Sequence, residues 1–179
     1  MDPHALGETL RSQTWLDSLE ERAHSAVSSA LEHLPDGVEP TLHGEFMGHP
    51  VHPAAVTLPI GALGSTVVLD TVAGATGNAA LDTGADATLA IGLLSALPAS
   101  ALGWADWARI EDRGTRRLGL IHATTNVIGL AAFAGSWVAR RKGNRKLGRK
   151  LAVFGMAVMT GGAYLGGKLA YEYRVGVKD

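Results

Sequence analysis

The sequence contains no cysteine among its 179 residues. Disulfides, iron–sulfur clusters bound by this chain and thiolate chemistry are therefore excluded. It also lacks three sequence motifs of enzymes: the phosphate loop G-x-x-x-x-G-K-[ST], the nucleophile elbow G-x-S-x-G and the zinc-binding helix H-E-x-x-H. We therefore expect the protein not to be an enzyme by itself.

The chain also has no marked excess of positive or negative charge. The 16 basic and 17 acidic residues give a net charge of −1, which argues against nucleic acid as a partner. A cleavable signal peptide is not seen, because Met1–Leu10 has no apolar core. We therefore expect the segment after His52 to act as an uncleaved insertion signal.

What the sequence does contain is four long stretches without Asp, Glu, Lys or Arg, the third of which has one histidine: Pro53–Leu69, Ala87–Ala105, Leu118–Ala139 and Leu151–Gly167. Each is about the length that a helix needs to cross ~30 Å of hydrocarbon. A soluble helical protein would instead distribute its charges along the polar faces of its helices. We therefore predict a multi-pass protein of the cell membrane, in contact with the lipid bilayer, with spans at about residues 53–74, 87–107, 118–139 and 151–171. Small residues at four-residue spacing predict close helix contacts: Gly61/Ser65, Gly92/Ala96, Ala99/Gly103, Ala131/Gly135 and Gly162/Gly166.

Residues 1–47 form a polar region that precedes this membrane domain of residues 48–179. Within it, Trp15, Leu19 and Val27 belong to an apolar pattern with helical spacing, and acidic residues lie mostly opposite. This predicts an amphipathic helix over about residues 14–34, packed against the membrane domain or against a partner. The predicted fold class is all-α: an integral membrane four-helix antiparallel bundle with a peripheral N-terminal amphipathic helix.

The orientation in the membrane depends on the basic residues. Seven of them lie between residues 140 and 150, and seven others lie on the opposite side of the four predicted spans. Their density in the short 140–150 loop favours a cytoplasmic location for that loop.

Polar residues gather at the predicted span ends on one side of the membrane. His122 and Asn126 are four residues apart, so they share one face of the third span. An ionisable group within a span usually faces the bundle interior and has a function. The same membrane side receives His49, His52, Asp106 and Tyr164, together with Trp104, Trp107, Lys168 and Tyr171.

An offset of 70 residues aligns His52 with His122 and Asp70 with Arg140. Two imidazoles at matching depth on facing helices are what axial ligation of haem b requires, and they can also bind a transition metal. His49 is an alternate ligand, and Asn126, Asp106 and Tyr164 would orient the rings. The same residues also fit a purely structural polar cluster, with His122 bonded to Asp106, or a quinone or small-ligand pocket.

On the other membrane side, Asp70 and Arg140 are expected to form an ion pair; a proton-relay role for Asp70 is the alternative.

Six motifs follow one another along the predicted membrane domain: Gly48–Pro53, Leu58–Gly61, Leu69-Asp70, Gly103–Trp107, His122 with Asn126, and Tyr164–Gly167. The segment from residue 48 to about residue 177 resembles the bacterial membrane family catalogued as domain of unknown function 2231. The resemblance implies a four-span protein of the bacterial inner membrane, and the family has no settled activity. Some relatives are joined to Rieske-type iron–sulfur domains, which implies a redox setting; without such a domain, this chain would need a bound haem or an external partner.

We therefore expect a redox or electron-transfer accessory module with a redox partner and a histidine-lined haem or metal site. The alternative is a non-catalytic scaffold or subunit that docks a protein of a membrane complex through its N-terminal helix, and either protein could form oligomers. A small-solute or proton transporter is less well supported, because few charges lie within the spans and no span is divided into half-helices.

Overall fold

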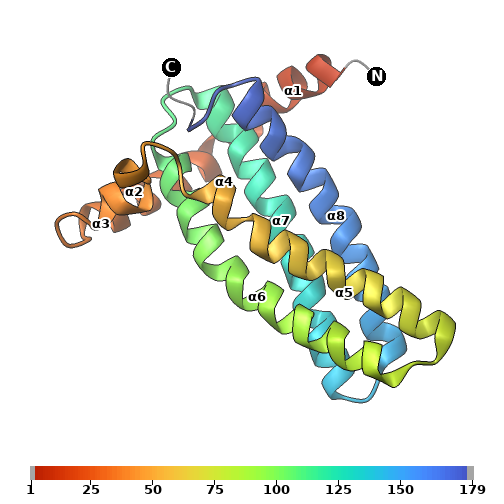
Figure 1. The fold of residues 1–179 in the computed structure, drawn as a ribbon. Coiled ribbons are helices and arrows are strands. Elements are labelled where there is room, and N and C mark those ends of the chain that lie inside the picture. Colours follow the sequence, from red (N-terminus) through yellow and green to blue (C-terminus); the bar gives the residue numbers. More distant parts are fainter. Residues whose placement is uncertain (1–2, 177–179) are drawn as a thin grey trace. The chain divides into compact units, whose positions relative to one another are not determined.

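The computed structural model describes residues 3–176, and its secondary structure there is helical throughout, without a strand (Figure 1). The all-α prediction is therefore confirmed. The N-terminal helices are short, except for one of 16 residues, and the four that follow α4 are long. The elements are α1 (Pro3–Arg11), η1 (Thr14–Leu16), α2 (Asp17–Glu32), α3 (Val38–Leu42), η2 (Glu45–Met47), α4 (His52–Ala55), α5 (Thr57–Thr76), α6 (Ala79–Ala108), α7 (Arg113–Arg141) and α8 (Arg145–Tyr171).

Within the described residues, three helical segments are long and apolar enough to cross a membrane: His52–Thr76, Ala79–Ala108 and Arg113–Arg141. Large apolar side chains point outward along them, as a bilayer allows and water does not favour; Leu94 and Leu97 on α6 are 68% and 69% exposed. Helix α8 covers the fourth predicted span, but it begins with four basic residues in its first six. A fourth crossing therefore stays a prediction.

Proline and glycine determine where the long helices break and turn. The break between α4 and α5 lies at Val56, three residues before Pro59, whose ring excludes the carbonyl of Ala55 from normal helix geometry. The α5–α6 connection and the α7–α8 connection each contain a Gly-Asn pair. Gly77 and Gly143 have φ values of +71° and +79°, which end the preceding helix, and the following asparagine side chain accepts a hydrogen bond from the next helix.

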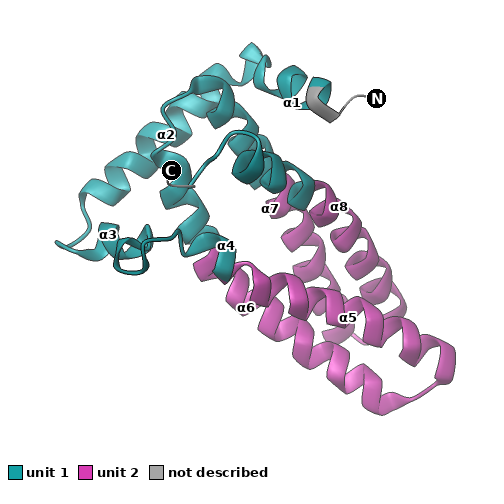
Figure 2. Ribbon diagram, turned by 45° about the horizontal axis from the view of Figure 1, so that its top comes forward, with its two compact units in different colours: residues 1–54, 100–124, 162–179 teal, residues 55–99, 125–161 magenta. Residues whose placement is uncertain are grey.

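The chain is divided into two compact units (Figure 2). The first comprises residues 1–54, 100–124 and 162–179, and the second comprises residues 55–99 and 125–161. Neither unit is one continuous segment, because α6, α7 and α8 each contribute residues to both. The predicted boundary at residue 48 stays a prediction.

The second unit has an apolar core to which α5, α6, α7 and α8 each contribute one fully buried side chain: Leu63, Leu89, Phe133 and Ala152. Small residues bring these helices together. A Cβ atom at Gly92 would lie 2.5 Å from Leu63 Cδ2, and one at Gly155 would lie 2.9 Å from the Gly129 carbonyl oxygen. A Cβ atom at Gly61, which sequence spacing also marked, would have no neighbour within 4 Å, so only part of that prediction holds.

The first unit is held together by an apolar cluster and by charged contacts. Leu118 of α7 packs with Leu165 and Leu169 of α8 in the cluster. The charged contacts join α2 to the α6–α7 connection and the start of α7. Glu20 has no exposed surface and accepts hydrogen bonds from Arg113 and Arg116. The acidic face of α2 is therefore turned inward.

Candidate functional site

The two predicted histidine ligands, His52 at the start of α4 and His122 on α7, both belong to the first unit. Each imidazole ring lies against a glycine of another helix. A Cβ atom at Gly103 of α6 would lie 2.8 Å from His52 Cε1, and one at Gly166 of α8 would lie 2.9 Å from His122 Cε1. The missing side chains allow the rings to approach the helix backbone directly.

A backbone hydrogen bond orients the His122 ring. Its Nδ1 lies 2.8 Å from the carbonyl oxygen of Gly162 on α8. Because a carbonyl oxygen can only accept a hydrogen bond, Nδ1 must donate, and the neutral ring then carries its lone pair on Nε2. Metal-binding histidines commonly have this arrangement, in which one ring nitrogen is fixed by a carbonyl and the other can ligate.

Across residues 3–176, no group of three or more histidine, aspartate or glutamate side chains is arranged to hold a metal ion. A closed site of the structural zinc type, which needs four ligands, is therefore not formed by the described residues.

Asp106 is bonded to a histidine that the sequence analysis did not select. Its Oδ1 atom lies 3.1 Å from Nδ1 of His43, and His43 Nε2 lies 3.6 Å from a carboxylate oxygen of Glu39. His43 is buried and its Nε2 makes no hydrogen bond. It lies in the polar region before residue 48, where no periodic pattern marked it; its adjacent glycine, Gly44, was the available signal.

His49 is exposed and lines an open cavity of about 370 Å³ in the first unit, beside His43 and Asp106. The connection between α6 and α7 and the residues after α8 complete its wall. The cavity thus contains two of the predicted site residues, His49 and Asp106. His52 and His122 do not line it.

The remaining two predicted residues, Tyr164 and Asn126, do not line this cavity either. Tyr164 is 44% exposed, and its ring centre lies 5.9 Å from Nζ of Lys168. Asn126 follows His122 by one turn on α7 and is half-buried, but it belongs to the second unit. Of the six predicted residues, His52 and His122 each pack against a glycine of a long helix, and His49 and Asp106 line one cavity.

The first unit also contains a charged rim around the α6–α7 connection. Asp112 accepts hydrogen bonds from the Thr115 backbone, the Thr115 hydroxyl and Arg11. The bond from the Thr115 hydroxyl, followed by that from Arg11, holds the pKa of Asp112 well below its usual range. On the same rim, Arg117 pairs with Asp17 of α2 at 2.6 Å.

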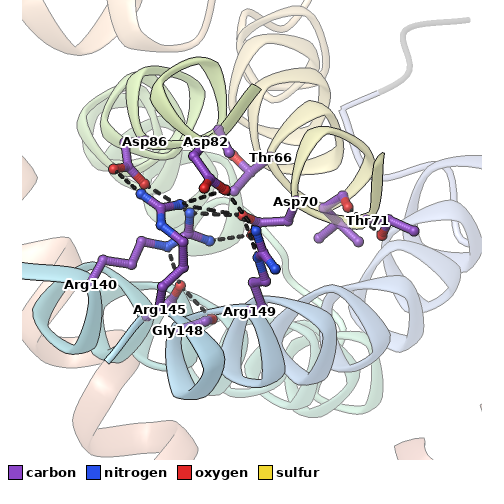
Figure 3. A network of polar contacts seen from close by, with 12 residues as sticks. Thr66, Asp70, Thr71, Asp82, Asp86, Arg140, Arg145, Gly148 and Arg149 are labelled. Carbon is purple, nitrogen blue, oxygen red and sulfur yellow. Dashed lines mark hydrogen bonds and ion pairs between the residues drawn. The ribbon is translucent and has the colours of Figure 1, made fainter. Parts of the chain in front are cut away.

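The second unit contains a separate network of three aspartates and three arginines (Figure 3). Arg140 makes a bidentate contact with Asp70, and both side chains are at most 4% exposed. The predicted pairing of Asp70 with Arg140 is therefore present. Arg140 also reaches Asp86 at 2.9 Å, while Arg145 and Arg149 reach Asp82 at 3.3 Å and 2.7 Å. The sequence analysis missed these additional partners, although all of them lie in the first two turns of α6 or α8.

Comparison with known proteins gives one match. A model of the family described as "Predicted membrane protein (DUF2231)" matches residues 48–179, which include every predicted site residue and exclude α1 to α3. No curated protein and no solved structure matches the chain significantly.

Proposed function

The chain belongs to this family of predicted membrane proteins, and from that premise we propose that it is a redox accessory module of the cell membrane. In this proposal, His52 and His122 hold haem b or a transition-metal ion, and the module exchanges electrons with a protein partner. When bound, such a group supplies one-electron chemistry that the side chains of this cysteine-free chain do not provide.

The observation that carries the proposal is the hydrogen bond from His122 Nδ1 to the Gly162 carbonyl at 2.8 Å. It orients the ring and places the proton of the neutral imidazole on Nδ1, so that Nε2 would be the ligating atom in this proposal. Gly103 and Gly166 let the His52 and His122 rings lie directly beside the helix backbones. His49 remains the alternate ligand, and it lines the cavity that Asp106 and His43 also line.

The experiment is an absorption spectrum of the detergent-purified full chain, recorded with and without added haem, together with elemental analysis for bound metal. We expect a Soret band in the unaltered protein and its loss in His122→Ala and in His52→Ala. His33→Ala is the matched control, because His33 is an exposed histidine at the end of α2. Absence of both haem and transition metal after supplementation would eliminate the proposal.

A second candidate, a scaffold that docks a protein partner through α2, is favoured by one observation. Asp17, Glu20 and Glu21 of α2 pair within the chain, whereas Trp15, just before the helix, and Leu19 are 73% and 54% exposed. The docking surface in this alternative is therefore the apolar side of the N-terminal helix and not its acidic side. Aromatic anchors of this kind dominate many protein interfaces.

A Trp15→Ser/Leu19→Ser variant tests this alternative, with Ser18→Ala as the control on an exposed residue of the same helix. We expect a partner that co-purifies from native membranes to be lost from the double variant and kept by the control. If the partner stays bound to the double variant, α2 is not the docking element. The bidentate contact of Asp70 with Arg140 gives no support to a proton-transport role for Asp70.

A further inference from the structure

We propose that the second unit binds the phosphate of an anionic phospholipid at the end of α7, in a cavity where Arg141 and Trp137 face α6. This site is independent of the histidine pair, which belongs to the first unit.

The first argument is an imbalance of charge. The second unit contains seven basic residues and three acidic ones. All three acids, Asp70, Asp82 and Asp86, are engaged by Arg140, Arg145 and Arg149. Four exposed cations are left without an acidic partner among the described residues of the chain: Arg141, Lys142, Lys146 and Lys150.

These four cations are concentrated around the α7–α8 connection, next to the end of an apolar helix. A cationic cluster at this position attracts the anionic lipids of the cytoplasmic leaflet, at about 1 kcal/mol for each basic residue. The first unit differs, because its acidic residues outnumber its basic ones by 14 to nine. The electrostatic attraction to anionic lipid is therefore a property of the second unit.

The second argument is a cavity that can receive one lipid molecule. It has a volume of about 430 Å³ and lies between α6 and α7. Ala87 and Ala90 of α6 and the Trp137 ring of α7 give it an apolar wall, and Thr83 and Arg141 lie toward the helix ends. The exposed side chains of Ile91 and Leu94 continue the apolar surface along α6. A polar rim above an apolar wall matches a phospholipid, with its phosphate at the rim and an acyl chain along α6.

The third argument concerns the hydrogen-bond donors at the rim. The Arg141 guanidinium lies 4.7 Å above the Trp137 ring, and stacking of this kind orients the guanidinium and leaves its N–H groups at the edge. A guanidinium edge binds phosphate oxygens in bidentate fashion. Asp86 also lines the cavity, but its carboxylate already accepts from Arg140 and Arg145, so its charge is neutralised locally.

The test is a titration of the detergent-purified full chain followed by native mass spectrometry. The ligands are phosphatidylglycerol, phosphatidylcholine with the same acyl chains, and glycerol 3-phosphate. We expect phosphatidylglycerol to bind at least tenfold more tightly than the other two. Arg141→Gln should weaken phosphatidylglycerol binding about tenfold, which corresponds to the loss of one charge-assisted bidentate contact.

Two further variants distinguish a defined lipid-binding site from non-specific electrostatic attraction. Trp137→Phe removes the indole N–H and weakens the stacking without changing the charge, and we expect about threefold weaker binding. Lys142→Gln removes an equivalent exposed charge from a residue that does not line the cavity, and we expect at most a twofold effect. Equal losses in Arg141→Gln and Lys142→Gln would overturn the proposal in favour of diffuse attraction. Equal binding of phosphatidylglycerol and phosphatidylcholine would also overturn it, as would glycerol 3-phosphate binding as tightly as the lipid.

Discussion

At the scale of single residues, this protein uses missing side chains to position imidazole rings. His52 and His122 each occupy the space that a Cβ atom would take at Gly103 or Gly166. The ring of His122 is then within reach of a carbonyl oxygen in the same helix as its glycine. Helix packing and ring orientation therefore depend on each other at these positions. A substitution that alters one of them should also alter the other.

Replacement of Gly166 by alanine should disturb the His122 ring. The new Cβ would lie 2.9 Å from Cε1, so the ring must move and its bond to Gly162 must lengthen. Overpacking of this kind costs about 1–3 kcal/mol of unfolding free energy. Gly167→Ala is the control, because nothing lies within 4 Å of its Cβ position, and alanine favours the helix by up to ~1 kcal/mol. Thermal unfolding in detergent measures the stability of the two variants. Equal unfolding midpoints for Gly166→Ala and Gly167→Ala would contradict this prediction.

Replacement of Arg140 by methionine should be far more costly than replacement of a surface cation. It leaves the buried Asp70 carboxylate without its bidentate partner, while Arg145 and Arg149 remain 3.7 Å away. We expect a loss of about 3–5 kcal/mol and, for the control Lys142→Met, a change within about 0.5 kcal/mol. The Asp70→Asn/Arg140→Met double variant should lose less than the sum of its single variants. Additive losses, measured by unfolding in detergent, would show that the two residues are not coupled.

At the scale of elements, α2 buries the charged side chain of Glu20 within the first unit, while the neighbouring Leu19 is 54% exposed. A helix in a soluble protein normally has the opposite arrangement. Sequence periodicity predicted the helix correctly but did not reveal which face is buried. The partners of Glu20 are Arg113 and Arg116, more than 90 positions later in the chain, and pairing over that separation leaves no local pattern.

Glu20 and Glu21 provide a matched pair for testing this arrangement. Glu20 is fully buried and accepts from two arginines, whereas Glu21 is mostly exposed and reaches Arg113 alone. Glu20→Gln should weaken the docking of α2 by about 1–3 kcal/mol, while Glu21→Gln should change it by less than about 0.5 kcal/mol. Hydrogen exchange of the α2 amides reports this difference. Similar protection in both variants would mean that the buried contact does not hold the helix.

The helix ends show how much of the fold was predictable. The uncharged stretches and the Gly-Asn pairs are local signals, so the positions of the long helices follow from the sequence. Pro59 and Pro98 carry the same local signal but differ in outcome: the chain breaks before Pro59, whereas α6 continues through Pro98. The candidate site was less predictable, because the bond between His43 and Asp106 joins residues 63 positions apart and neither has a neighbour that indicates the other.

At the scale of the whole molecule, the main question is how often the chain crosses the bilayer. Three helical segments meet the length and hydropathy that a crossing requires, and the family match places α4 to α8 in a predicted membrane protein. The basic start of α8 lowers its hydropathy without introducing a charge between Leu151 and Gly167. We therefore retain four crossings as the prediction.

Labelling of single introduced cysteines would establish the number of crossings, because the chain has none of its own to remove. Suitable exposed positions are Glu111 before α7, Asn144 between α7 and α8, and Tyr171 at the end of α8. With four crossings, an impermeant reagent should label residues 111 and 171 from one side and residue 144 from the other. Labelling of residues 144 and 171 from the same side would reduce the number of crossings to three.

The aspartate–arginine network has a consequence for biogenesis. Because a ribosome makes the chain from its N-terminus, Asp70, Asp82 and Asp86 of α5 and α6 are translated before any of their arginine partners. The hairpin of α5 and α6 therefore reaches the insertion machinery with three uncompensated carboxylates, which a lipid interior disfavours. Its final embedding must await the later hairpin, so nascent chains that stop short of Arg140 should remain at the translocon or be degraded.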